Sequence, residues 1–467
     1  MRKFDIVIVG GGIAGLATAE MFARSGYKTL LLEKGSNLCH EASGVHHEWF
    51  HFGSLYSIFP NRQYLRTLTG GIDDLLQYYR DFDGMNLRID GEGKLIKIPA
   101  ETGWFREDNL EYVIATTDAP DFSFSNIQNA RDLARKVFMR MVWNLAVKRF
   151  VCRHNRFHKY DWRRGFASHY IPKAGWRDYS GSFIHEFDST ETDLDPACHI
   201  AMRSYDSPMH AYHIVSELTR GFLSNGGRIE THAPFRRFRS GTQGVEVVTD
   251  NGAQFLAQKL ILASGEALQR HSGGRIRVKS VVSPLLVAAP GVCSRNLVRL
   301  TPFMNQTINH IQHTIDGYDY SLIGGGYFAP VEDEKAIEAA GNKLLRNAKS
   351  VFPALAEAEL LNLYFGIKSE MISAGAKRNY LYRVEQIEQD VYGIVPGKFS
   401  LAFSLAFTTF RDITGRYPRT YTSYNRQLDV NDYVALTKHK ALVKDFVSFK
   451  SVTTSKLEES QLLETQT

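Results

Sequence analysis

Residues 7–34 most constrain how this 467-residue chain can fold. A short apolar strand runs into Gly10-x-Gly12-x-x-Gly15, an apolar helix follows, and a second strand ends at Glu33. In such a unit the first glycine permits a tight turn, the second lets the backbone approach a pyrophosphate, and the third lets the helix pack on the strand. The helix N-terminus offers N–H groups to the phosphates, and Glu33 can accept hydrogen bonds from ribose hydroxyls. The pattern predicts a parallel βαβ unit that binds a dinucleotide, without separating FAD from NAD.

The bulk properties are those of an ordinary globular protein. Hydrophobic residues make up 43% and charged residues 23%, which excludes collagen-like, low-complexity and largely disordered chains. The four cysteines lie far apart with no C-x-x-C pair, so we expect no disulfide framework and predict a reducing, cytoplasmic location. No apolar run reaches the ~18 residues of a membrane span, and the apolar N-terminal stretch is too short for a signal peptide.

Helices and strands alternate along the chain without a Pro- or Ser-rich linker. Helices are expected over residues 13–24, 62–82, 126–147, 210–225, 332–350, 400–413 and 429–450. Strands are expected over 4–9, 29–32, 228–230, 244–249 and 259–263, and within 280–329. The absence of a linker predicts that any two domains are interleaved rather than sequential.

Two later segments favour FAD over NAD. Residues 259–265 form an apolar strand that ends in small residues, and residues 392–399 lead into a helix closed by Gly415. Together with the N-terminal motif, these segments resemble the D-amino-acid-oxidase-like superfamily of FAD-dependent oxidoreductases. That superfamily includes glycine and sarcosine oxidases, glycerol-3-phosphate dehydrogenase and 2-hydroxyglutarate oxidase. The resemblance covers roughly residues 1–60, 205–270 and 385–420.

The resemblance implies an α/β fold with two interleaved domains. One is a Rossmann-like FAD-binding domain, and the other is an α+β substrate domain built on a mainly antiparallel sheet. We assign residues 1–90, 200–270 and 385–425 to the FAD-binding domain, 91–199 and 271–384 to the substrate domain, and 426–450 to a C-terminal helix. The polar tail, 451–467, is expected to be disordered.

The resemblance also implies which residues contact FAD. They are Gly10, Gly12, Ile13, Ala14, Gly15, Glu33, Lys34, Ser43, Gly44, Val45, Ser264, Gly265, Gly397, Lys398 and Phe399. Reduced flavin gathers negative charge near N1 and the C2 carbonyl, which Lys398 and the start of the following helix can stabilise. The alternative is that Lys398 lies at a solvated helix start.

The loop after Glu33 carries the candidate catalytic residues. Its pattern Ser-Gly-Val … His-x-Gly-x-x-Tyr resembles the hydroxyacid-oxidase branch, with three extra residues between the halves. His51 or His47 is assigned acid–base or substrate-positioning work, because imidazole titrates near neutral pH. Tyr56 is either a hydrogen-bond donor to substrate or an aromatic filler. Three alternatives remain for His46, His47 and His51, namely a covalent flavin link, hydrogen bonding within the loop, and a metal site; we predict no metal because no convincing fourth ligand is present.

The resemblance places a cationic anchor for a substrate carboxylate near residues 364–380. Arg378 is the candidate, with Lys368 as the alternative, and either could instead be a surface charge. The pattern Gly324-x-Gly326-x-x-Ala329 is interpreted as part of a hairpin rather than a second nucleotide site, because no strand ending in an acid follows about 20 residues later.

The expected function is that of an FAD-dependent oxidoreductase. It oxidises a C–N or C–OH bond of a small acid, an amino acid or a biosynthetic intermediate by hydride transfer to flavin. The alternatives are a flavin-binding subunit with a docking role and an NAD-only dehydrogenase. Residues 148–177 carry nine basic residues and one acid among aromatics, so a protein partner or a membrane surface could dock there. We do not expect nucleic acid as a partner, and a solvated insertion packed on the core is the simplest alternative.

Overall fold

The N-terminal motif folds as the sequence predicts. In the computed structural model, β1 (Arg2–Val9), α1 (Ile13–Arg24) and β2 (Thr29–Leu32) form a parallel βαβ unit. Gly10 has φ +108° at the turn into the helix, a conformation that residues with a side chain rarely adopt. The structure describes residues 1–52, 62–89, 95–108, 110–115, 184–185, 189–203, 206–301, 306–372 and 381–449.

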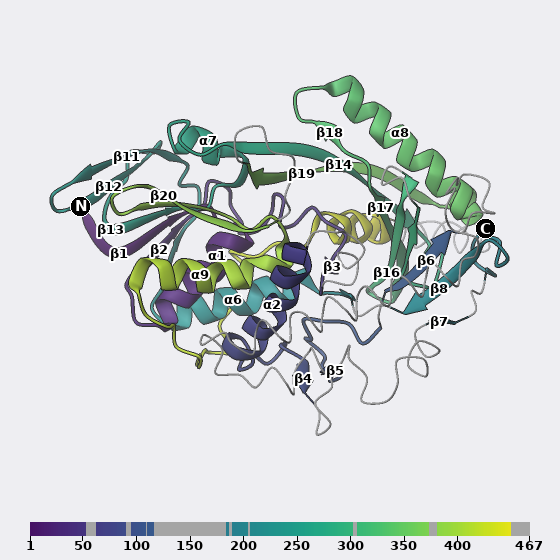
Figure 1. Ribbon diagram of the computed structural model, residues 1–467, viewed down its shortest axis with the longest axis horizontal. Coiled ribbons are helices and arrows are strands. Elements are labelled where there is room, and N and C mark those ends of the chain that lie inside the picture. Colours follow the sequence, from purple (N-terminus) through teal and green to yellow (C-terminus); the bar gives the residue numbers. More distant parts are fainter. Residues whose placement is uncertain are drawn as a thin grey trace, which may run out of the picture.

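The first sheet is built around this unit. Four strands lie side by side and parallel, in the order β10 (Arg228–Glu230), β2, β1 and β13 (Gln254–Leu262). The C-terminal end of β13 also pairs in parallel with β21 (Val391–Val395). β11 (Phe235–Gly241), β12 (Gly244–Thr249) and β20 (Arg383–Glu388) add antiparallel pairings. Helices α2 (Arg62–Tyr78), α6 (Ala211–Ser224) and α9 (Ala402–Thr414) lie with α1 along one side of the sheet (Figure 1).

The second sheet is mainly antiparallel, as expected. Its order is β18 (Ala329–Pro330), β14 (Val278–Ala289), β17 (Tyr318–Gly325), β16 (Ile308–Ile315), β15 (Leu297–Leu300), β6 (Glu111–Ala115), β8 (His199–Arg203) and β7 (Ile184–His185). β19 (Leu360–Met371) pairs along the whole of β14, and the two long strands reach from the first sheet to the second (Figure 1). α8 (Glu334–Val351) packs on the outer side. Because β16 and β17 form a hairpin that contains Gly324, the hairpin interpretation of that glycine pattern is confirmed.

Short elements complete the described chain. They are β3 (Trp49–Phe50) paired with β9 (Ser207–Pro208), β4 (Leu87–Ile89) paired with β5 (Leu95–Lys97), η2 (Gly265–Ala267), α7 (Leu268–His271), η4 (Pro353–Glu357) and η5 (Phe399–Leu401). One apolar cluster joins α1 and α9 to residues of β15 and β16, so the two sheets share a core.

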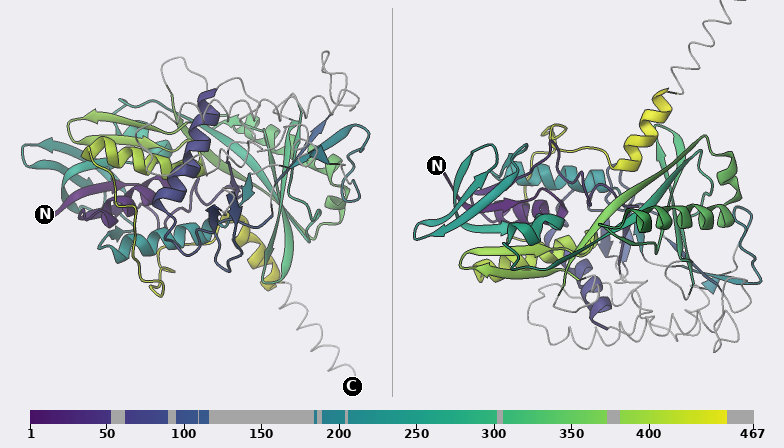
Figure 2. Two further views of the ribbon diagram at one scale, coloured as in Figure 1. Left: turned by 60° about the horizontal axis from the view of Figure 1, so that its bottom comes forward. Right: turned by 90° about the horizontal axis from the view of Figure 1, so that it is seen from above.

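Two expectations are corrected. β8 pairs with β6 and therefore belongs to the second sheet, so the assignment of residues 200–203 to the FAD-binding domain is wrong. The last helix spans 438–449 and not 429–450, because the chain turns at 431–433 and bridges Val434 to Leu38 before the helix begins (Figure 2). The helix expected over 126–147 and the 451–467 tail lie outside the described residues. Among the helices that are described, none is long and apolar enough to cross a membrane.

Candidate functional site

A groove of about 200 Å³ runs along the carboxyl ends of the parallel strands. We call it the nucleotide groove, and its lining includes Gly10, Gly12, Ile13, Ala14, Glu33, Lys34, Ser43, Ser264 and Gly265. The Glu33 carboxylate accepts hydrogen bonds from Gly11 N–H (2.7 Å) and Gly35 N–H (2.8 Å), which fix it at the end of β2. Carboxylate oxygens can accept further bonds, so ribose hydroxyls could bind the same group.

The glycines of the motif serve different purposes. A Cβ on Gly15 would lie 1.9 Å from the Gly10 carbonyl oxygen, so Gly15 is required by the packing of α1 on β1. A Cβ on Gly12 would meet only Ser43 Oγ, at 3.4 Å, which is ordinary contact. The protein's own packing therefore does not demand a glycine at 12. A ligand that approaches the backbone closely does, and this position fits a dinucleotide pyrophosphate.

A second space of about 280 Å³ adjoins the groove. We call it the histidine cavity, because His46, His47 and His51 line it together with Trp49. The wall also includes residues from β15, β16, β17 and β19 and from the 396–399 segment. Ile13, Ala42, Ser43 and Pro396 line both spaces, so groove and cavity form one elongated site. Its shape fits a long cofactor whose nucleotide end and reactive end lie apart.

His51 is held by a buried carboxylate. Its Nδ1 lies 3.7 Å from Asp206 Oδ2, and the Asp206 side chain has no exposed area. Asp206 also accepts hydrogen bonds from Phe52 N–H (2.8 Å), Tyr112 Oη (2.6 Å) and Trp49 Nε1 (3.2 Å). Burial pushes the pKa of Asp206 upward, but His51, and after it Tyr112 and the Phe52 N–H, outweigh burial and keep that pKa below its ordinary value. The ionised carboxylate therefore orients the imidazole.

The three loop histidines are uncharged at neutral pH. Burial, with the nearby Lys398, lowers the pKa of His51 to about 4, although Asp206 acts in the opposite direction. Burial and Lys368 hold the pKa of His47 well below its usual range, and burial lowers that of His46 to about 4. A neutral imidazole can accept a proton, which an imidazolium cannot.

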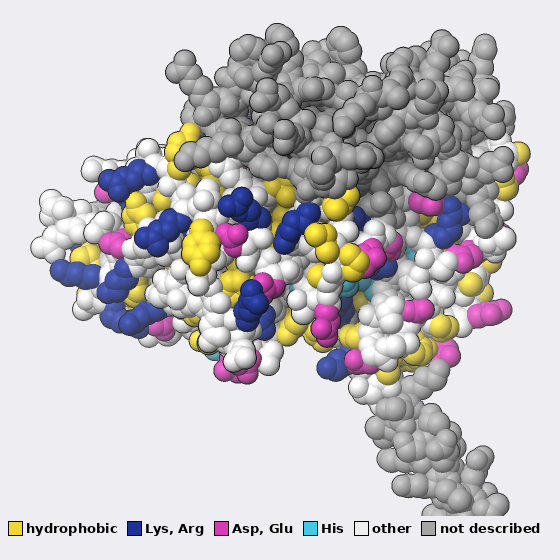
Figure 3. Space-filling model, turned by 90° about the horizontal axis from the view of Figure 1, so that it is seen from below, with side chains coloured by type: hydrophobic (Ala, Val, Ile, Leu, Met, Phe, Trp, Pro, Cys, Tyr) yellow, Lys and Arg dark blue, Asp and Glu magenta, His cyan; other side chains and the backbone are white. Residues whose placement is uncertain are grey.

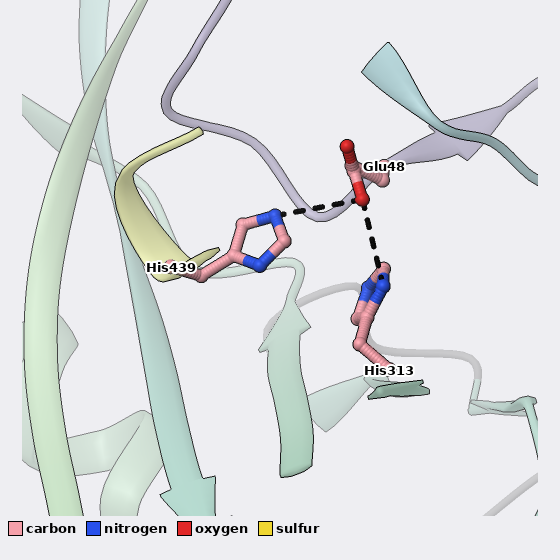
Figure 4. A group of neighbouring side chains, drawn as sticks. All are labelled: Glu48, His313 and His439. Carbon is pink, nitrogen blue, oxygen red and sulfur yellow. Dashed lines mark ion pairs between the residues drawn. The ribbon is translucent and has the colours of Figure 1, made fainter. Parts of the chain in front are cut away.

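A buried polar cluster lies behind the loop (Figure 4). Glu48 Oε2 is 3.5 Å from His313 Nδ1 and 3.7 Å from His439 Nε2, and the three residues come from the loop, β16 and the last helix. The Lys440 ammonium lies 3.1 Å from both Glu48 oxygens and already supplies a positive charge. His439 is hydrogen-bonded to Tyr320 Oη (2.8 Å) and to Thr437 Oγ1 (2.9 Å). This arrangement favours a structural ion-pair network over a metal site.

The cluster ties the C-terminal segment to the histidine loop. Lys438 N–H donates to the Gly44 carbonyl oxygen (2.9 Å), and Leu38 N–H donates to the Tyr433 carbonyl oxygen (2.7 Å). Although burial raises the pKa of Glu48, Lys440 and the two histidines outweigh it and hold that pKa well below its ordinary value. Glu48 has φ +50°, an unusual value for a residue with a side chain, and its N–H donates to His46 Nδ1 (2.9 Å).

The site residues predicted from the sequence fall into three groups in the structure. Gly397, Lys398, Phe399, His47, His51 and Lys368 line the histidine cavity. Gly15, Gly44 and Val45 line neither space: a Cβ on Gly44 would lie 2.5 Å from the Cys39 carbonyl oxygen, and Val45 packs near Gly366 and the last helix. Tyr56, Arg378 and the basic segment 148–177 lie outside the described residues, so their roles stay predictions. On the described part of the face in Figure 3, basic and acidic side chains are interspersed.

Sequence reasoning missed Asp206, Glu48 and the polar pair Thr307 and Asn309, which also line or support the cavity. Nothing around Asp206 marks it as a partner of His51, because 155 positions separate the two along the chain. A sequence signal exists for Thr307 and Asn309, because these polar residues alternate with the apolar Ile308 where a strand begins.

Comparisons with known proteins agree with this geometry. Residues 5–374 match the family described as FAD dependent oxidoreductase (DAO). Glycine oxidase from Geobacillus kaustophilus is similar in structure, with a TM-score of 0.59 and 16% identity over 94% of this chain and 100% of that one. L-α-glycerophosphate oxidase from Mycoplasma pneumoniae, solved with FAD bound, has a TM-score of 0.60 and 15% identity over 93% of this chain and 99% of that one. L-proline dehydrogenase from P. horikoshii has a TM-score of 0.57 and 13% identity over 90% of this chain and 95% of that one. A search of curated protein sequences found no significant match.

The fold and the two-part site therefore define a flavin-dependent redox enzyme. The chain belongs to the DAO family of FAD-dependent oxidoreductases, and FAD is its cofactor. The nucleotide groove would hold the ADP half of FAD, and the histidine cavity would hold the reactive half with the substrate.

Proposed function

We propose that this enzyme oxidises the C–OH bond of a small anionic substrate, a 2-hydroxy acid, with His51 as proton acceptor. The supporting observation is the pairing of His51 with Asp206 at the wall of the histidine cavity. A cytoplasmic location and a docking surface within 148–177 remain predictions from the sequence.

The charges around the cavity favour an alcohol over an amine. Lys368 and Lys398 line it, while none of its described lining residues is an aspartate or a glutamate. Asp206 is buried behind His51 and already accepts three hydrogen bonds. The ammonium group of an amino acid would meet cations and neutral imidazoles here, whereas a carboxylate would be attracted. A hydroxy acid carries the carboxylate without the ammonium.

The reaction needs two transfers from the substrate. FAD, when bound, accepts the hydride that leaves the carbinol carbon. We assign the hydroxyl proton to His51 Nε2, the ring nitrogen further from Asp206, so that the carbon–oxygen bond becomes a carbonyl. Asp206 stabilises the imidazolium that results, and Lys368 binds the substrate carboxylate. Lys398 lines the histidine cavity, and its charge would offset negative charge on reduced flavin.

An anaerobic titration of the purified holoenzyme tests this function. We expect 2-hydroxy acids to bleach the flavin absorption, and glycine and L-proline, the amino acids suggested by the structural neighbours, to leave it oxidised. His51→Gln should slow flavin reduction by about 10²–10⁴-fold at unchanged flavin content, because a positioned base contributes that much. His232→Asn, at an exposed histidine with φ +49° that Asn tolerates, is the matched control.

Two results would contradict the proposal. One is bleaching by amino acids but by no 2-hydroxy acid, which would favour C–N oxidation. The other is an undiminished rate of reduction in His51→Gln, which would remove the histidine from the proton transfer.

A further inference from the structure

Two buried polar residues, Asn309 of β16 and Thr307 directly before it, lie in the wall of the histidine cavity. Thr307 and Asn309 line it, and they are only 6% and 5% exposed. Within the described part of the chain, neither Thr307 Oγ1 nor Asn309 Oδ1 has a hydrogen-bond partner. Such groups are rare in folded proteins, because a buried polar atom without a partner destabilises the structure. Two of them on one cavity wall need an explanation.

The sheet is shaped to hold the Asn309 amide. Asn309 lies opposite Gly324 in the β16–β17 pairing, and a Cβ on Gly324 would lie 2.7 Å from Asn309 Oδ1. Any other residue at 324 would therefore displace the amide. Gly324 belongs to the glycine pattern interpreted above as part of a hairpin, and it leaves room for the side chains of Asn309 and Leu285.

The neighbouring wall is apolar. Val298 and Leu300 of the adjacent strand β15 line the same cavity, as does Phe328. The lysine assigned to the carboxylate, Lys368, lies on β19, which is separated from β16 by β14 and β17 in the sheet order. A ligand that contacts Lys368 and Asn309 therefore needs polar groups at two ends and carbon atoms between them.

We infer that Thr307 and Asn309 form a specificity subsite for a neutral hydrogen-bonding group, a hydroxyl or a carboxamide, at the far end of the substrate. The inference rests on the proposed function, because it takes the reacting 2-hydroxy acid end to be at His51 and Lys368. A hydroxyl or amide can donate to Asn309 Oδ1 and can exchange a hydrogen bond with the Thr307 hydroxyl. A methyl group in the same place leaves both atoms without a partner.

Matched substrates test the subsite. The probes are 2-hydroxyhexanoate, 2,6-dihydroxyhexanoate and the monoamide 5-carbamoyl-2-hydroxypentanoate, which differ at the far end. With the holoenzyme, we expect the hydroxyl and amide compounds to exceed the methyl compound in kcat/KM by about 10- to 100-fold, because the methyl compound leaves buried polar atoms unpaired. In the Thr307→Val, Asn309→Leu double variant this ratio should fall to about 1, because no polar group is left at the subsite to distinguish the three far ends.

Stability distinguishes a ligand subsite from a structural role. Replacing unpaired buried polar groups with apolar groups of similar size should leave the melting temperature of the substrate-free holoenzyme unchanged or raise it. Thr314→Val, further along β16, is the control: the Thr314 hydroxyl donates to Asp319 Oδ1 (2.5 Å) and lies on the exposed part of the strand. It should leave the substrate ratio as it is. A clear fall in melting temperature for the double variant would show that the two groups stabilise the fold and would overturn the inference.

Binding keeps this test separate from that of the proposed function. If no 2-hydroxy acid reduces the flavin, the proposed function fails, but dissociation constants for the same three compounds can still be measured from the shift of the flavin spectrum. A preference for the polar-ended compounds that the double variant loses supports the subsite. Equal binding of all three compounds, no binding at all, or a preference that persists in the double variant overturns it.

Discussion

The nucleotide groove and the histidine cavity adjoin each other but are built in different ways. The groove is lined by residues within the first 43 positions and by two short segments near 233–235 and 263–271, with few additions. The cavity draws on the histidine loop, four strands of the second sheet and the 396–399 segment. The groove therefore depends on local backbone geometry, and the cavity depends on how distant segments pack.

The electrostatics of the two spaces differ as well. In the groove, the glycine turn and the Glu33 carboxylate, which the N–H groups of Gly11 and Gly35 hold in place, would meet the ligand. In the cavity, two lysines and three neutral histidines meet it, and their pKa values are set mainly by burial. The first arrangement holds a cofactor without reacting, whereas the second can accept a proton. Binding and chemistry are thus assigned to different parts of one continuous site.

The largest effect is expected from a substitution that blocks the nucleotide groove and leaves the histidine cavity unchanged. Gly12→Val should abolish FAD retention, because the new side chain would occupy the space of the pyrophosphate while the protein itself leaves room for a Cβ. The flavin-to-protein absorbance ratio of the purified variant measures this. Gly241→Val, in an exposed hairpin where the nearest atom is 3.6 Å from the new Cβ, is the control and should keep its flavin. Normal flavin content in Gly12→Val would show that the groove has been misplaced.

A second change tests whether the cavity depends on tertiary packing. Lys440→Met leaves the buried Glu48 carboxylate without its cation and should lower the free energy of unfolding by about 3–5 kcal/mol. Urea denaturation measures the loss, and Lys444→Met, at an exposed position of the same helix, should cost far less.

The pH dependence of this loss has a definite sign. Because the folded pKa of Glu48 lies well below its ordinary value of 4.5, its ionised form stabilises the wild type above about pH 4.5, and that stabilisation is lost as the pH falls through the folded pKa. The difference between wild type and Lys440→Met should therefore shrink in acid. A difference that grows in acid would mean that another group carries the effect.

The smallest expected effect concerns the His51–Asp206 pair. Asp206→Asn should lower the rate of flavin reduction by about 10-fold, less than the loss of His51 itself. Asp206 raises the pKa of His51, so without its charge that pKa falls below about 4 and the acid limb of kcat/KM moves to lower pH. Tyr112→Phe removes one hydrogen bond to Asp206 but keeps the charge, and should leave the limb nearly in place. If the acid limb of kcat/KM does not move in Asp206→Asn, Asp206 does not influence the pKa of the catalytic base.

Much of the fold was predictable because its signals are local. The ranges of α1, β2, β10 and β12 agree with those expected from periodicity and from glycines that end elements. The last helix was predicted too long, because residues 429–437 carry enough apolar side chains for a helical pattern. In the structure, Val430 and Val434 are buried in the core that α1 and α9 share, on a turning segment rather than a helix.

The sequence by itself determined the βαβ unit, the glycines that admit a pyrophosphate, and the loop that carries His47 and His51, because each depends on spacing within a few dozen residues. Only the tertiary structure decided that Asp206 would orient His51, that Lys440 would neutralise Glu48, and that Thr307 and Asn309 would share a cavity with Lys368. These contacts join residues far apart in the chain. Their energies come from burial and from charge in a low-dielectric interior, and neither exists until the two sheets have packed together.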